Sequence, residues 1–146
     1  QKYGKLNFLR DHQMVFLDYL VQRRDAWFVE AGDRGLIYLT HIIRQGNAHL
    51  NFVFWDGRLT ADRREAVRTV TKTAMQLFKL PRITSTCPYT NKALWLTLRK
   101  MEFVLEGVTR KGYVTVDGYV DLMVFGVTDD EVREWPVLSM TSSALT

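Results

Sequence analysis

Basic side chains concentrate between residues 57 and 80, where they could bind a small polyanion. Lys and Arg outnumber Asp and Glu there by four, an excess equal to the net charge of +4 of the whole chain. A local cationic patch of this kind suits a nucleotide phosphate or, more weakly, a nucleic acid. The same pattern also fits the solvated face of an ordinary helix, so the patch alone leaves these interpretations open. The basic residues are Arg58, Arg63, Arg64, Arg68, Lys72 and Lys79.

Side chains that could accept a proton lie just before this patch. His49 and Asn51 lie within the alternating segment 49–55 and Asp56 follows it, while Glu30 and His41 lie on the segments expected beside it. A histidine or a carboxylate in such a place can act as a general base toward an amine. A lone histidine on a strand is more often structural than catalytic. Position alone makes His49 the first candidate for the base and Asp56 the second.

The single cysteine, Cys87, is not predicted to be a nucleophile. No His–acid pair is visible beside it in the sequence, so we interpret it as a small buried hydrophobe. One cysteine cannot form an internal disulfide, which fits a reducing compartment. No group of His, Cys and Asp has the spacing of a metal site, so no metal is expected.

The composition is typical of a single globular domain. The chain has 146 residues, of which 47% are apolar and 25% are charged, a balance typical of soluble folds. No apolar run approaches the roughly 18 residues that a membrane-spanning helix needs, and the first residues lack an apolar signal-peptide core. We therefore expect one cytoplasmic domain over residues 1–134. An exposed extension over 135–146 could contact a protein partner.

Hydrophobic periodicity and turn residues predict an α/β fold. Helical spacing predicts helices over 9–25, 61–80 and 91–101, of which the second begins after Thr60 and ends before Pro81. The order of elements predicts a mixed sheet with helices on both faces. The strands before and after the second helix should be parallel, because that helix forms a crossover. Alternation and β-branched content place the strands at 3–8, 27–31, 36–44, 49–55, 82–87, 103–110 and 119–127.

Residues 91–127 read NKALWLTLRKMEFVLEGVTRKGYVTVDGYVDLMVFGV and resemble the C-terminal half of the GNAT acyltransferases, especially the branch that acetylates protein N-termini. The resemblance implies a GNAT-like, mostly antiparallel sheet of six to seven strands with a splayed central parallel pair. It also implies acyl transfer from acetyl-CoA to a primary amine by direct attack. The acceptor would be a protein N-terminus or a small amine. The matching residues are Asn91, Phe103, the pair Glu106–Gly107, and Asp121.

The resemblance also implies where the coenzyme A phosphates bind. The family loop reads Q/R-x-x-G-x-G/A, and the pair Glu65–Ala66 sets the register in this chain. Arg58 then agrees with the pattern, Ala61 replaces the central Gly, and Arg63 stands where a small residue is usual. The Arg63 side chain would either obstruct the phosphates or pair with them. The implied cofactor-binding residues are Phe54, Trp55, Arg58, Ala61, Asp62, Arg63 and Asn91.

Some positions depart from the family pattern. Leu98 stands where many members have a Tyr that protonates the departing thiolate, and Glu102 replaces a Gly. Water could protonate the thiolate instead. These departures leave open a second interpretation, a catalytically inactive GNAT-fold module with a structural or partner-binding role.

Overall fold

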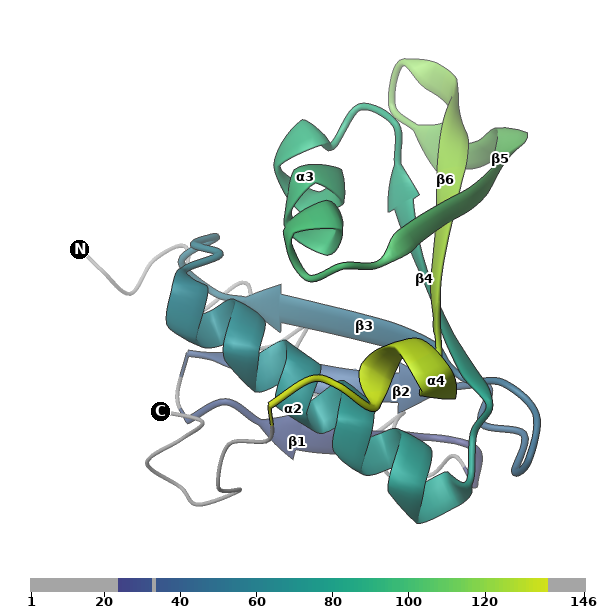
Figure 1. Ribbon diagram of the computed structural model, residues 1–146. Helices are drawn as coiled ribbons and strands as arrows, with labels where there is room; N and C mark the ends of the chain where they lie inside the picture. The colour runs from purple at the N-terminus through teal and green to yellow at the C-terminus, as the bar shows by residue number, and fades with distance from the viewer. Residues whose placement is uncertain (1–23, 33, 137–146) are drawn as a thin grey trace.

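The computed structural model of the chain describes residues 24–32 and 34–136. The strand expected over 3–8 lies outside these residues, as does nearly all of the helix expected over 9–25. In the described part, six strands form one sheet in the order β1-β2-β3-β4-β6-β5 (Figure 1). The strands are β1 (Trp27–Glu30), β2 (Gly35–Thr40), β3 (His49–Phe54), β4 (Arg82–Pro88), β5 (Val104–Thr115) and β6 (Gly118–Thr128). The helices are α2 (Ala61–Phe78), α3 (Lys92–Lys100) and α4 (Asp129–Val132).

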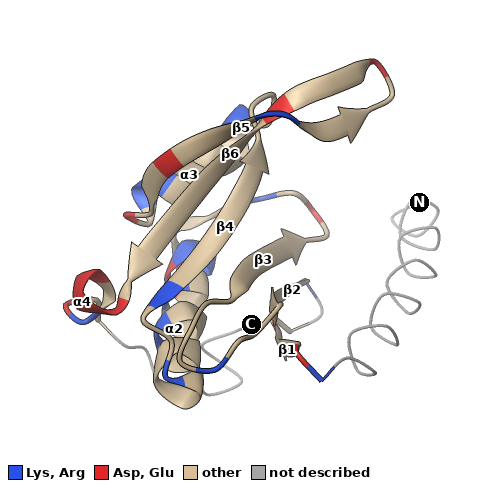
Figure 2. Cartoon of the chain, turned by 90° about the vertical axis from the view of Figure 1, so that its right-hand side faces the viewer, with Lys and Arg blue, Asp and Glu red and all other residues tan. Residues whose placement is uncertain are grey.

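The sheet is mixed and mostly antiparallel, as the sequence predicts. Among the described strands only β3 and β4 run parallel, and α2 provides the crossover between them. Helices α2 and α3 lie on the same face of the sheet (Figure 2). None of the helices in the described part has the length and hydropathy of a membrane span.

Helix α2 is stabilised by capping at both ends and by one buried apolar stripe. The Thr60 hydroxyl accepts a hydrogen bond from the Arg63 N–H at 3.3 Å and caps the helix. Ala66, Val70 and Ala74 are buried against the sheet. The helix ends at Phe78 rather than at 80, because the next residue, Lys79, takes a left-handed conformation with φ of 52°.

Strands β3 and β4 are joined at one end and separate at the other (Figure 2). Among the described residues their only ladder pair is His49 with Thr84, supported by a 2.9 Å hydrogen bond from the Thr84 N–H to the Ala48 carbonyl. Beyond this pair, β3 follows β2 and β4 follows β6 along their full lengths. Since each strand stays with a different neighbour, the two diverge. The expected splayed parallel pair is confirmed.

The β5–β6 hairpin explains the Glu106–Gly107 pair. Glu106 is a bulge residue, because Leu105 pairs with Phe125 and Gly107 with Val124. Its carboxylate reaches across β6 and forms an ion pair with Arg82 on β4.

Helix α3 ends where Glu102 departs from the family pattern. Glu102 has φ of 68°, a conformation that Gly adopts without strain. The Glu102 N–H donates to the Arg99 carbonyl at 2.9 Å, and the Phe103 N–H donates to the Leu98 carbonyl at 3.0 Å. These two hydrogen bonds form a Schellman motif. The usual Gly at this position is therefore a helix-ending residue, and Glu102 replaces it without changing the backbone course.

Trp135 is packed against the described fold. It was expected to begin an exposed extension, yet only 4% of its surface is exposed. Its ring lies 6.0 Å from that of Phe103, and the Arg68 guanidinium stacks 4.3 Å above it. Packing therefore continues past residue 134, while residues 137–146 lie outside the described part.

Candidate functional site

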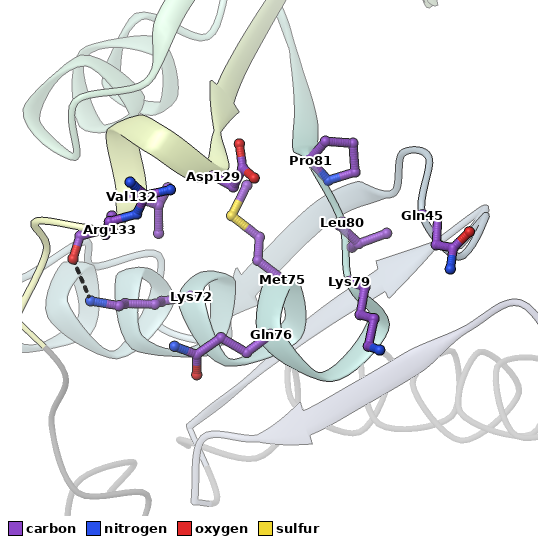
Figure 3. Close-up of a pocket in the computed structure, with 10 residues that line it drawn as sticks. All are labelled: Gln45, Lys72, Met75, Gln76, Lys79, Leu80, Pro81, Asp129, Val132 and Arg133. Carbon is purple, nitrogen blue, oxygen red and sulfur yellow. Dashed lines mark hydrogen bonds between the residues drawn. The ribbon is translucent and has the colours of Figure 1, made fainter.

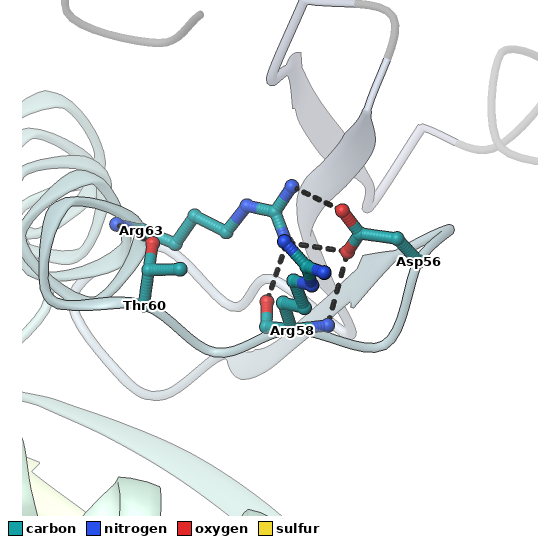
Figure 4. A network of polar contacts seen from close by, with 4 residues as sticks. All are labelled: Asp56, Arg58, Thr60 and Arg63. Atoms are coloured by element: carbon teal, nitrogen blue, oxygen red, sulfur yellow. Dashed lines mark hydrogen bonds and ion pairs between the residues drawn. The ribbon is translucent and has the colours of Figure 1, made fainter.

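The turn between β3 and α2 is closed by an ion pair between Asp56 and Arg63 (Figure 4). Arg63 Nη1 donates to Asp56 Oδ1 at 2.6 Å, and Arg63 Nη2 donates to Asp56 Oδ2 at 3.0 Å. The Arg58 N–H also donates to Asp56 Oδ1, at 3.0 Å. A bidentate arginine and a backbone amide thus hold one carboxylate.

Arg63 is fixed on its other sides as well. Nη1 donates to the Arg58 carbonyl at 2.6 Å, and the guanidinium lies 4.7 Å from the centre of the Phe54 ring. Only 12% of the Arg63 side chain is exposed, against 46% for Asp56. Arg63 therefore folds back toward the end of β3, and its guanidinium is aimed at an anion in this turn.

This environment makes Asp56 a poor proton acceptor. The hydrogen bond from Arg63, followed by that from the Arg58 N–H, holds the pKa of Asp56 well below its usual range. The same hydrogen bond raises the pKa of Arg63. A general base needs a pKa near the working pH, so the ion pair with Arg63 opposes the expected role of Asp56 as a base, which stays a prediction.

The first turn of α2 offers further donors. The Arg63 N–H is capped by Thr60, whereas the N–H groups of Ala61 and Asp62 bond to no described residue. Free amides at the start of an 18-residue helix favour an anion through the helix dipole. Together with Arg58 and Arg63, they form a donor set suited to phosphate oxygens. We call residues 56–63 the phosphate-loop candidate.

The gap between β3 and β4 opens on the side of this loop. Odd-numbered residues of β3 pair with β2 through the backbone; for example, the Trp55 N–H just past the strand donates to the Arg34 carbonyl at 2.7 Å. By alternation, the peptide groups of Phe52 and Phe54 face β4. No ladder pair among the described residues joins either of them to β4. Backbone N–H groups therefore line this side of the gap.

Asn91 lies at the corresponding end of β4. Its Oδ1 accepts the Leu94 N–H at 3.2 Å and caps α3, and its own N–H donates to the Pro88 carbonyl at 2.9 Å. Its amide nitrogen donates to no described residue. The structure thus brings Asn91 and the phosphate-loop candidate to the same end of the two splayed strands.

His49 lies at the other end, where β3 and β4 are still paired. Its ring centre is 5.3 Å from that of His41, which begins the loop after β2 with φ of 53°. Partial burial, followed by the nearby His41, lowers the pKa of His49. The lowered pKa favours the neutral form of the ring, which a base needs, but His49 is separated by the length of β3 from the loop.

Cys87 and Leu98 are buried and contribute no catalytic group. Burial raises the pKa of the Cys87 thiol to about 11, and the thiol donates to the Pro88 and Asn91 carbonyls. Leu98 is fully buried in α3, and its apolar side chain has no proton to donate where the family has a Tyr. Residues 24–32 and 34–136 contain no group of three His, Cys, Asp or Glu able to hold a metal.

A separate hollow of about 570 Å³ lies between the C-terminal half of α2 and α4 (Figure 3). Lys72, Lys79 and Asp129 are among its lining residues. Lys72 is already engaged, since its Nζ donates to the Arg133 and Trp135 carbonyls at 2.8 and 2.7 Å. The hollow lies at the opposite end of α2 from the phosphate-loop candidate.

The sequence did not reveal that Asp56 binds Arg63. The two residues are seven positions apart across a turn, a separation outside the helical i, i+4 spacing that predicts ion pairs. The available signal was Arg63 itself, which stands where the family pattern has a small residue.

Comparison with known proteins supports the fold. No protein-family model and no curated protein sequence matches the chain. A crystal structure of a probable GNAT-family acetyltransferase from Chromobacterium violaceum is 25% identical, covers 80% of this chain and 63% of its own, and superposes with a TM-score of 0.70. A GNAT-family acetyltransferase from Bacillus anthracis is 19% identical over 67% of this chain and 60% of its own, with a TM-score of 0.59. Spermidine N-acetyltransferase from Vibrio cholerae is 14% identical over 85% of this chain and 77% of its own, with a TM-score of 0.69.

These similarities confirm the GNAT fold that the sequence predicts. The chain spans less than two thirds of the length of the first two proteins, at 63% and 60%. The branch that acetylates protein N-termini is not singled out, because the similar structures include a spermidine acetyltransferase.

Proposed function

We propose that this chain, which has the GNAT fold, is an acyl-CoA-dependent N-acyltransferase that transfers an acetyl group to a primary amine. The observation that carries the proposal is the splayed parallel pair β3–β4 with an anion-binding turn at its open end. A splayed pair exposes backbone donors between two strands, and the start of α2 places further donors beside them. Acetyl-CoA would supply the acetyl group as a thioester.

The residues present fit such a ligand. The amides of Ala61 and Asp62, with Arg58 and Arg63, would bind the phosphates. The free amide nitrogen of Asn91 would donate to the pantetheine arm.

The remaining residues around the gap would position the reaction. The backbone N–H of Phe54, and the segment leading to Trp55, would hold the carbonyl to be attacked. Proton removal from the amine would fall to His49 through intervening water, because His49 lies at the other end of β3 from Phe54. Water would also protonate the thiolate. Direct attack needs the amine only to be neutral and correctly placed.

The acceptor would be a small amine or the α-amine of a protein. The resemblance of residues 91–127 favours a protein N-terminus, whereas the similar structures include a spermidine N-acetyltransferase. A protein partner bound through the C-terminal segment finds no support, since Trp135 at its start is buried.

Calorimetry with acetyl-CoA tests the cofactor, and thiol release in the presence of a panel of amines tests the transfer. We expect binding that Arg63→Ala weakens by about 1–3 kcal/mol, the range for a charge-assisted contact. Arg99→Ala is the matched control, since Arg99 lies on α3 and stacks on Trp95. An absence of acetyl-CoA binding at millimolar concentration would refute the proposal and leave an inactive GNAT-fold module. If acetyl-CoA binds but no amine in the panel causes thiol release, acetyl-CoA would stay as a ligand of this chain and the proposed acetyl transfer would be rejected.

A further inference from the structure

The Asp56 carboxylate occupies donors that the proposed function assigns to phosphate. Both oxygens accept from the Arg63 guanidinium, at 2.6 and 3.0 Å, and Oδ1 also accepts from the Arg58 N–H at 3.0 Å. A bidentate arginine with a backbone amide binds phosphate by the same geometry. The loop thus holds an anion of its own (Figure 4).

The two partners of this ion pair differ in how freely they can leave it. Arg63 is 12% exposed, stacks 4.7 Å from the Phe54 ring centre, and donates to the Arg58 carbonyl at 2.6 Å. The Asp56 side chain is 46% exposed, and its hydrogen bonds to described residues are all made by its carboxylate oxygens. Rotation of the Asp56 side chain into solvent would therefore free the donors while Arg63 stays in place.

We propose that Asp56 is an intramolecular competitor for phosphate at residues 56–63, so that the phosphates of an acyl-CoA bind only by exchange with its carboxylate. The inference rests on the proposed function and deepens it, because it names a residue that sets the affinity of that site. Exchange replaces one anion by another on Arg63, so that the guanidinium keeps a partner throughout. The unpaired carboxylate would then stand near the bound phosphates and repel them.

Asp56→Asn tests the proposal with little change of shape. The Asn side-chain oxygen can still accept the Arg58 N–H, whereas the negative charge and the ion pair with Arg63 are lost. Asp62→Asn is the matched control. It removes the same charge from the first turn of α2, and the Asp62 side chain makes no hydrogen bond or ion pair with a described residue. Calorimetric titrations of the full chain and both variants would use coenzyme A and, separately, inorganic pyrophosphate.

We expect Asp56→Asn to tighten binding of both ligands by about two- to fivefold beyond the effect of Asp62→Asn, the scale of one exposed ion pair. Equal effects of the two variants on affinity would overturn the proposal, since the gain would then come from the loss of one negative charge near the site and not from the freed Arg63. Weaker binding to Asp56→Asn would also overturn it and would make Asp56 a residue that positions the loop. Pyrophosphate binding that tightens without any coenzyme A binding would keep Asp56 as a competitor and reject the proposed function. If neither ligand binds any of the three proteins, both proposals fail.

Discussion

Trp135 donates its indole N–H to the Glu102 carboxylate at 3.1 Å and so ties the end of α3 to the segment after α4. Glu102 is also 3.5 Å from Arg68 on α2. One exposed acid therefore links three helices, at a position where its own backbone has φ of 68°. The favourable contacts and the unfavourable backbone conformation oppose each other in the stability of the fold.

These opposing effects predict that Glu102→Gly destabilises the protein when Trp135 is present and stabilises it when Trp135 is replaced. In the natural chain the variant should lower the free energy of unfolding by about 1 kcal/mol. The reason is that a buried indole N–H without an acceptor costs about 1–3 kcal/mol, more than the roughly 1 kcal/mol gained from relief of the left-handed backbone. In a Trp135→Phe background no indole N–H remains, so the same change should stabilise by about 1 kcal/mol. Urea denaturation measures both values, and the same sign in both backgrounds would contradict the argument.

Gly126 should be required for the ion pair between Arg82 and Glu106. A Cβ at Gly126 would fall on the Glu106 carboxylate and lie 2.7 Å from Arg82 Nη2. We expect Gly126→Ala to destabilise by about 1 kcal/mol, because an ion pair that is a third exposed contributes no more than this. In a Glu106→Ala background, Gly126→Ala should leave the free energy of unfolding nearly unchanged. A double-mutant cycle from denaturation curves provides the test, and equal costs in both backgrounds would exclude the coupling.

The pH dependence of turnover should report His49, if the proposed function holds. Burial and His41 lower the pKa of His49 from its ordinary value of 6.5. As the pH falls through that lowered value, the ring becomes protonated and cannot accept a proton, so kcat should fall there. We expect His49→Ala to lower kcat by about 10²-fold and to remove this inflection.

His41→Ala is the informative control for that experiment. It removes the neighbouring charge, so the pKa of His49 should rise and the inflection should move to higher pH. Unchanged kcat in His49→Ala would exclude this histidine and leave water as the proton acceptor.

Cys87 should not react with alkylating reagents in the folded protein. With its pKa at about 11, about one thiol in a thousand is ionised at pH 8, and the side chain is fully buried. We expect alkylation by iodoacetamide to be undetectable over hours in buffer and complete within minutes in guanidinium. Rapid modification of the folded chain, measured by mass spectrometry, would show that the strand end opens.

Local sequence determined helices α2 and α3 and the parallel pair β3–β4. Thr60 and Asn91 are capping residues whose side chains act within three positions, and the stripe of Ala66, Val70 and Ala74 needs only helical spacing to be recognised. The crossover helix then required β3 and β4 to be parallel. These features follow from neighbours in the chain, and sequence patterns record such neighbours directly. For that reason these elements were predictable apart from their ends. Helix α2 and strand β2 stop early at the left-handed residues Lys79 and His41, and β5 runs to Thr115 rather than ending at residue 110.

Tertiary structure decided how the polar residues are used. Asp56 was predicted as a base, but the turn brings it against Arg63. Glu106 meets Arg82 only because β6 lies between their strands and carries Gly126 at the crossing point. Trp135 looked like the start of a tail, but it is buried against Phe103. These contacts join residues that no local spacing relates, and they exist only once the strand order and the helix positions have been set.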